Sequence, residues 1–183
     1  MVNSKGQESA PFELLIAVII MGFVIFAGMQ AMRQLWLQKC FGTTDAKLEE
    51  LKTLVETSVS QKSPRTINFR LSGCFNEGDE TIEITDRDEP GICADYCGSP
   101  KPLCSLLEYS NSGTSSFTMI KCLEIPPDTF FPSQKYSGGR CTPRDDSLLI
   151  DLEEDMPQGD YLFVNETLAT DTFPTICAYK KEV

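Results

Sequence analysis

Residues 13–32 read ELLIAVIIMGFVIFAGMQAM, and this apolar stretch decides how the rest of the chain is organised. From Leu14 to Met32 there is no charged residue, and Gln30 is the one polar side chain. As a helix the stretch extends roughly 28 Å, close to the roughly 30 Å hydrocarbon core of a bilayer. It therefore predicts a helix that lies in a membrane for at least part of the protein's life.

Composition restricts what the remainder of the 183 residues can do. The formal net charge of −11 disfavours nucleic acid and anionic membrane surfaces as partners of the region beyond the helix. The chain has no histidine, which excludes Ser/His/Asp and Cys/His catalytic sites. No phosphate-binding loop, dinucleotide fingerprint or nucleophile elbow occurs. We therefore expect a protein that is not an enzyme and that uses no cofactor.

The cysteines indicate an oxidising compartment. An even number of them in a chain of this kind predicts up to four disulfides, formed outside the cytosol. Eight cysteines allow 105 pairings, and the sequence does not select among them. The Cys93-x3-Cys97-x6-Cys104 spacing contains no Cys-x2-Cys pair, so residues 91–104 are predicted to be a disulfide-stapled loop without a metal. The eight positions are Cys40, Cys74, Cys93, Cys97, Cys104, Cys122, Cys141 and Cys177.

Beyond Met32 the chain becomes amphipathic, with Trp36 at a position suited to a membrane interface. Residues 42–45 read GTTD and predict a break or kink, followed by a second helical piece from Ala46 to about Ser60. One face of that piece is apolar, at i, i+3, i+7 and i+11, and is expected to pack on the following sheet: Leu48, Leu51, Val55 and Val59. Ser63 and Pro64 end the helix.

From Thr66 onward the pattern changes to short β runs separated by Gly, Pro and Asp. With no helix pattern between them, an antiparallel sheet or sandwich is expected. The fold class is therefore α+β: a long N-terminal hydrophobic helix followed by an antiparallel, β-rich, disulfide-stapled globular head. The expected strands are 66–71, 81–85, 106–109, 116–125, 147–152, 160–165 and 175–179. Residues 126–143 are expected to be a long loop tied down by Cys141, with Phe130 and Phe131 in the core or at a subunit contact.

The N-terminal sequence carries a family resemblance. Lys5-Gly6-Gln7-Glu8-Ser9, followed by Phe12-Glu13-Leu14-Leu15 and an apolar helix, resembles the class III signal peptide of archaeal type IV pilin-like proteins. In that family a prepilin peptidase cuts before the hydrophobic helix, which stays with the mature protein. The family usually has its glutamate at the fifth mature residue. Glu13 is seventh from Gln7, so either the cut differs or this chain carries a two-residue extension.

The resemblance implies three parts and a lollipop-shaped subunit. Residues 1–6 would be a leader removed between Gly6 and Gln7, residues 7–62 the long helix, and residues 63–183 the extracellular head. The glutamate is expected to meet the new N-terminal amine of a neighbouring subunit, an opposite-charge pair that a packed helical core requires. The residues that the resemblance assigns to subunit assembly are Glu13, Leu14, Leu15, Ile19, Phe23 and Phe26.

The expected function is that of a structural subunit of a type IV pilus-like filament at the cell surface, serving adhesion. Its partners would be copies of itself, the prepilin peptidase, the pilus assembly machinery and, before assembly, the membrane. Three alternatives stay open. The chain could be a minor pilin or pseudopilin, a single-span anchored protein with a ligand-binding head, or a cleaved secreted protein.

Two further motifs lie in the head. Asn165-Glu166-Thr167 is an N-glycosylation acceptor, which suits an extracellular subunit and makes Asn165 a predicted glycan site. Acidic residues cluster at 79–89 and 145–155 and could bind calcium or act as a glycosidase acid and base. No Asp-x-Asp-x-Asp-Gly loop is present, so a solvated sheet face is the preferred interpretation.

Overall fold

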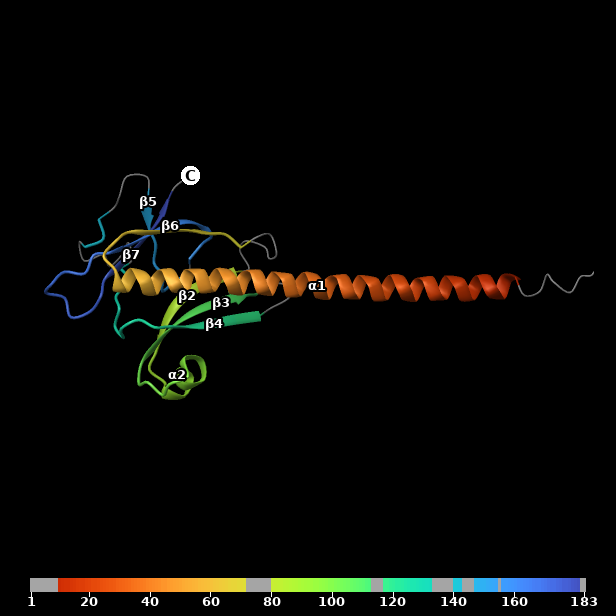
Figure 1. Ribbon diagram of the computed structural model, residues 1–183, viewed down its shortest axis with the longest axis horizontal. Helices are drawn as coiled ribbons and strands as arrows, with labels where there is room; N and C mark the ends of the chain where they lie inside the picture. The colour runs from red at the N-terminus through yellow and green to blue at the C-terminus, as the bar shows by residue number, and fades with distance from the viewer. Residues whose placement is uncertain are drawn as a thin grey trace, which may run out of the picture. The chain divides into compact units, whose positions relative to one another are not determined.

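The computed structural model describes residues 10–71, 80–112, 117–132, 140–142, 147–154 and 156–181. The chain divides into two compact units, Met1–Gly42 and Thr43–Val183 (the head). Helix α1, Ala10–Ser60, contributes residues to both units, and all the described strands belong to the head (Figure 1). The α+β class predicted from the sequence, a long apolar helix followed by antiparallel sheets and disulfides, is confirmed.

Helix α1 is less interrupted than the sequence suggested. The predicted break at residues 42–45 is wrong, because the helical assignment continues through them to Ser60. A glycine in a helix interior costs only about 1 kcal/mol relative to alanine. The burial of Leu48, Leu51 and Val55 in the head outweighs that cost, since each buried side chain contributes about 1.5–3 kcal/mol.

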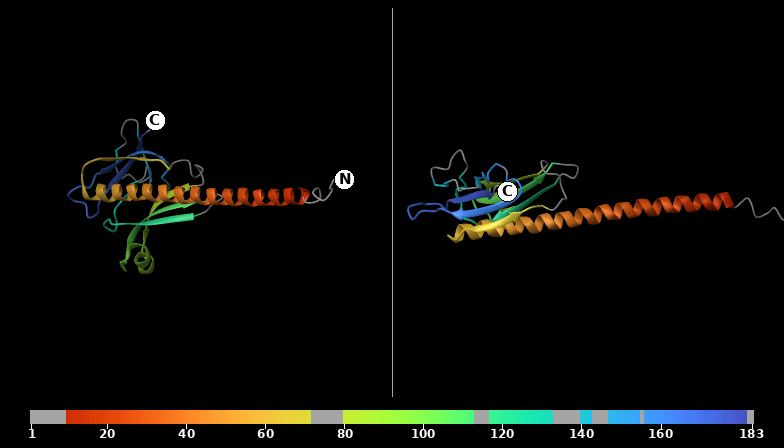
Figure 2. Two further views of the ribbon diagram at one scale, coloured as in Figure 1. Left: turned by 45° about the vertical axis from the view of Figure 1, so that its right-hand side comes forward. Right: turned by 90° about the horizontal axis from the view of Figure 1, so that it is seen from above.

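The head contains two antiparallel sheets. The four-stranded sheet has the order β1-β6-β7-β5 and the three-stranded sheet the order β2-β3-β4. The observed bounds are β1 Arg65–Phe69, β2 Glu80–Arg87, β3 Cys104–Asn111, β4 Phe117–Leu123, β5 Ser147–Leu149, β6 Gly159–Asn165 and β7 Ile176–Lys181. Every strand expected from the sequence is found near its expected place. Figure 2 shows these strands beside the yellow part of α1.

One segment joins the two sheets by backbone hydrogen bonds. After β5, the amide of Ile150 donates to the carbonyl of Ala178 on β7, at 2.9 Å. Two residues later the chain has crossed to β2: the amide of Ile84 donates to the carbonyl of Leu152, and the amide of Met156 donates to the carbonyl of Ile82. This crossing explains why β5 is shorter than the expected strand at 147–152.

The core of the head lies where α1 meets both sheets. Leu48, Leu51 and Val55 are fully or almost fully buried and join one apolar cluster with side chains from both sheets, such as Phe69 and Tyr109. The apolar face predicted for this part of the helix is thus confirmed, except that Val59 is only partly buried. Leu51→Ala would remove buried methyl groups from this cluster.

Polar contacts fasten strand β4 to α1 beside that core. Lys121 Nζ lies 2.6 Å from Asp45 Oδ1 and 3.4 Å from Glu49 Oε2. The hydrogen bond to Asp45 raises the pKa of Lys121 above its usual value. The amide of Glu124, just beyond β4, donates to Glu56 Oε1 at 2.7 Å. Asp45 and Glu49 are exposed, so water screens their ion pairs with Lys121, which align the helix and the strand more than they stabilise them.

The cysteine-dense region contains a helix rather than a loop. Helix α2 covers Pro90–Cys97, which corrects the loop predicted over residues 91–104. Pro90 is the first residue of the helix, where the N–H that proline lacks would have no partner within the helix. Gly98 caps the C-terminus with a φ of 64°, and its amide donates to the carbonyl of Ala94. Cys93 and Cys97 are therefore one turn apart on one face of a helix.

Those two cysteines bind α2 to the three-stranded sheet. Cys93 is bonded to Cys104 at the start of β3, and Cys97 to Cys122 on β4. In Figure 1, α2 lies at one end of that sheet, as these bonds require. A third disulfide joins Cys141 to Cys177 on β7.

Candidate functional site: an exposed apolar helix

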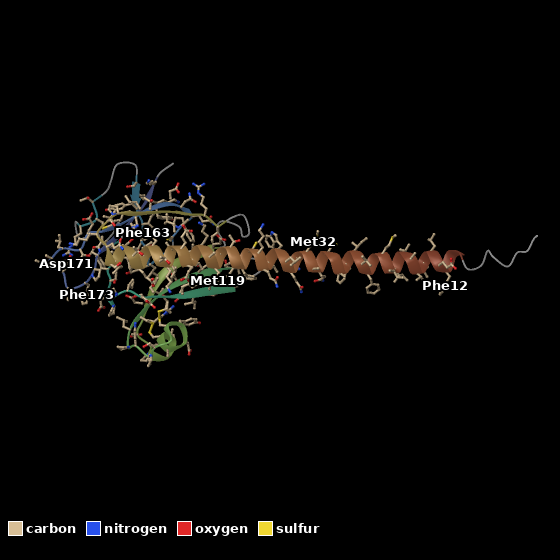
Figure 3. All side chains as sticks on the ribbon, in the orientation of Figure 1. Phe12, Met32, Met119, Phe163, Asp171 and Phe173 are labelled. Atoms are coloured by element: carbon tan, nitrogen blue, oxygen red, sulfur yellow. A yellow bond between two sulfur atoms is a disulfide. The ribbon has the colours of Figure 1, made fainter. Side chains whose placement is uncertain are left out.

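The most unusual surface of the protein is the first part of α1. Every large apolar side chain from Phe12 to Trp36 is at least 41% exposed. Side chains project both above and below this part of the helix between the labelled Phe12 and Met32 (Figure 3). The local reason for helix formation is plain, since Ala, Leu, Ile and Met predominate and Glu13 is an acid in the first turn.

Water cannot be the final environment of this surface. Burying one large apolar side chain is worth about 1.5–3 kcal/mol, so leaving the whole row half-exposed costs on the order of 20 kcal/mol. A helix that is apolar on all sides belongs in lipid or inside a protein assembly. Among the described residues, α1 is the one helix long and apolar enough to cross a membrane, and its most apolar window has no buried residue. Both observations are compatible with membrane attachment through this helix.

The residues predicted for subunit assembly all lie on this exposed surface, but they do not share one face. Leu15, Ile19, Phe23 and Phe26 follow at i, i+4, i+8 and i+11 and form a single stripe. Glu13 lies about 160° around the helix from Leu15, at 100° per residue. Glu13 is thus exposed on the opposite side of the helix from this stripe. A helix used in this way needs neighbours on several sides.

The other predicted sites have different outcomes. Gly6 and Gln7, the expected cleavage position, lie outside the described residues, as does Cys74. Cys40 is disulfide-bonded, as are the six cysteines of the three pairs described above. Asn165 ends strand β6, with its side chain hydrogen-bonded to the end of α1. Phe131 is buried in the core, whereas Phe130 is 43% exposed.

The acidic clusters do not form a metal centre within the described residues. No group of three or more carboxylates or cysteines that could hold a metal ion is found there. Burial raises the pKa of Glu153, and the nearby charges of Asp151 and Asp86 raise it further. Asp86 accepts a hydrogen bond from Ser105 at 2.6 Å, so part of this cluster is engaged in strand-to-strand contacts. Like charges crowded in this way destabilise the head slightly at neutral pH.

A polar network inside the head was not anticipated from the sequence. Gln158 accepts from the amide of Leu71 at 2.9 Å and donates to Glu80 at 2.7 Å, and Glu80 in turn accepts from the hydroxyl of Tyr109 at 3.0 Å. Burial, followed by the adjacent charge of Glu80, raises the pKa of Tyr109. The network links Leu71, two residues beyond β1, to Glu80 and Tyr109 of the three-stranded sheet. Its role is therefore to hold these parts of the head together.

Comparison of the chain with protein-family models, curated proteins and solved structures finds no match.

Proposed function

We propose that this chain is a structural subunit of an extracellular type IV pilus-like filament, assembled through its N-terminal helix after removal of residues 1–6. The observation that carries the proposal is the exposed apolar row from Phe12 to Trp36 on a chain whose head is stapled by disulfides. The resemblance of Lys5-Gly6-Gln7 and the following segment to a class III signal peptide adds the expected processing.

The mechanism is assembly without chemistry. The apolar helix first lies in the membrane, where lipid covers all its sides. In the filament, copies of the same helix replace the lipid, so that one apolar environment is exchanged for another. Since little apolar surface enters water at any step, the exchange needs no large hydrophobic driving force, and close packing of side chains selects the assembled state.

The placement of the assembly residues supports contacts on several sides of each helix. The stripe Leu15, Ile19, Phe23 and Phe26 provides one contact face, and Glu13 points away from it. In a bundle, the glutamate would face a different neighbouring helix from the one that this stripe contacts. A buried carboxylate without a partner is costly, and the free N-terminal amine created by cleavage is the partner proposed for it.

The head suits the outside of a filament. Disulfides form and persist outside the cytosol, and a net charge of −11 keeps exposed surfaces solvated and self-repelling. We propose adhesion as the purpose. A minor pilin or pseudopilin would have the same helix and the same head, so its abundance in filaments is what separates the two roles.

A second candidate rests on the same exposed helix. In a single-span protein with a ligand-binding head, lipid alone would cover this helix, and the chain would keep its leader. On the head, the outward face of α1 forms a shallow, open surface lined by residues such as Ala46, Thr53 and Thr57, on which a ligand or another chain could lie.

The variant Gly6→Leu separates the candidates. If the peptidase cuts after Gly6, the variant keeps its leader, stays in the membrane fraction and forms no filaments. Asn3→Leu is the matched control, with the same bulk placed inside the leader, and it should assemble normally. Filaments formed by Gly6→Leu with its leader attached would remove the basis for the processing step.

A further inference from the structure

The carboxyl end of helix α1 is closed by a side chain from the four-stranded sheet. The last carbonyls of a helix have no partner within the helix, and α1 has no basic residue in its last turn to supply one. Asn165, the last residue of β6, fills this role. Its Nδ2 donates to the carbonyls of Ser58 and Val59, each at 3.0 Å.

The rest of the Asn165-Glu166-Thr167 motif is engaged as well. Asn165 Oδ1 accepts a hydrogen bond from the amide of Thr167 at 3.0 Å. The hydroxyl oxygen of Thr167 accepts from the amide of Thr175 at 2.9 Å, just before β7. Both side chains that define the glycosylation motif are therefore used as hydrogen-bonding groups within the head.

This geometry opposes a sugar on Asn165. A glycosylated asparagine keeps one hydrogen on Nδ2, because the anomeric carbon of the sugar replaces the other. Nδ2 lies 3.0 Å from both helix carbonyl oxygens, so its hydrogen-bonding side is occupied by the end of α1. A carbon bonded to Nδ2 would have to share this space and would remove one of the hydrogens that serve these carbonyls. Rotating the side chain outward would break all three hydrogen bonds of Asn165.

We propose that Asn165 is the C-terminal cap of helix α1, and that carbohydrate at Asn165 and the folded head exclude one another. The motif that predicts a glycan site is then a structural joint between α1 and the β6–β7 pair. A transferase could modify Asn165 only in a chain whose β6 had not yet met the helix. This inference concerns the head alone and does not depend on the proposed function.

Two measurements on the full-length protein test the proposal. The first is peptide mapping by mass spectrometry of folded protein purified in detergent from its own cells, and Asn165 should be unmodified. The second compares Asn165→Ala with Asn68→Ala. Asn68 is an exposed asparagine on β1 whose Nδ2 donates to Asp160, so its loss is the matched control. The thermal unfolding midpoint of Asn165→Ala, measured by near-UV circular dichroism, should lie roughly 4 °C or more below that of Asn68→Ala.

Either measurement can overturn the proposal. A glycan on Asn165 in the folded protein would contradict the exclusion directly. Equal unfolding midpoints for Asn165→Ala and Asn68→Ala would show that the two hydrogen bonds to the helix end contribute nothing particular, and the capping role would be lost. Support requires an unmodified Asn165 together with the larger loss for Asn165→Ala.

Discussion

Phe23→Glu should abolish assembly while leaving the head folded. Phe23 lies near the middle of the apolar stretch and is 71% exposed, so its replacement removes few contacts within the chain. In a lipid environment the exchange is severe. An acid at the centre of a membrane helix costs about 2.5–3.5 kcal/mol, whereas phenylalanine contributes about −0.3 to −0.6 kcal/mol. The total of about 3 kcal/mol per subunit corresponds to roughly a 150-fold change in partition.

The assay is the yield of the chain in membranes and in sheared extracellular filaments, measured by quantitative immunoblotting. Leu148→Glu is the matched control, because Leu148 is a large apolar residue that is exposed on the head, in β5. This control should change neither yield. Near-UV circular dichroism of both purified variants checks that the head keeps its packing.

Wild-type yields of membrane-bound and filament protein from Phe23→Glu would contradict this prediction. Such a result would mean that the middle of the apolar stretch meets neither lipid nor another helix. Equal losses from Phe23→Glu and Leu148→Glu would refute it too, because the effect would then follow from exchanging an apolar residue for an acid at any exposed place.

Four further outcomes concern the head. The double variant Cys141→Ser/Cys177→Ser opens a disulfide with a sequence separation of 36 residues, and urea unfolding should show a loss of about 4 kcal/mol. Leu51→Ala should cost about 2–5 kcal/mol by the same measurement, whereas Lys121→Ala, which breaks ion pairs with two exposed carboxylates, should cost about 1 kcal/mol or less. The raised pKa of Glu153 means that the folded state holds its proton more tightly than the unfolded state. The stabilisation is thus present in acid and is lost as the pH rises through the folded pKa, so Glu153→Gln should raise the unfolding midpoint at pH 7 and not at pH 3.

The sequence predicted those elements whose side-chain periodicity is strong and local. The apolar run from Leu14 to Met32 predicted the exposed helix, and alternation at Ile82 and Ile84 predicted β2, where both are buried. The segment after β5 behaved differently. Leu148, Ile150 and Leu152 alternate as one strand would, yet the chain leaves β7 after Ile150 and pairs with β2. That choice depends on partners distant in sequence.

Helix α2 was missed although its signal was present. Cys93 and Cys97 are four residues apart, which is one helical turn, and Pro90 and Gly98 stand at the favoured start and end positions of a helix. Proline and glycine also mark loops, and the cysteine density made a loop the simpler interpretation. The disulfides to Cys104 and Cys122 select the helix, because it places both sulfurs on the side that faces β3 and β4.

The Asn165 cap could not be predicted from local sequence. Its two acceptors, the carbonyls of Ser58 and Val59, lie more than a hundred residues earlier in the chain. A glycosylation motif is defined by three consecutive residues and carries no information on what the folded chain brings to the asparagine. Only the pairing of β6 with β1, which follows α1 directly, brings Asn165 to the end of the helix.

The most direct test of the account is the identity of the N-terminus in extracellular filaments. Filaments sheared from the cell surface should contain this chain as an abundant component, and mass spectrometry should find that it begins at Gln7 with the apolar helix intact. The opposite result would be a chain found in membranes alone, with residues 1–6 still attached. That result would contradict assembly through a processed N-terminal helix and would leave a membrane-anchored head.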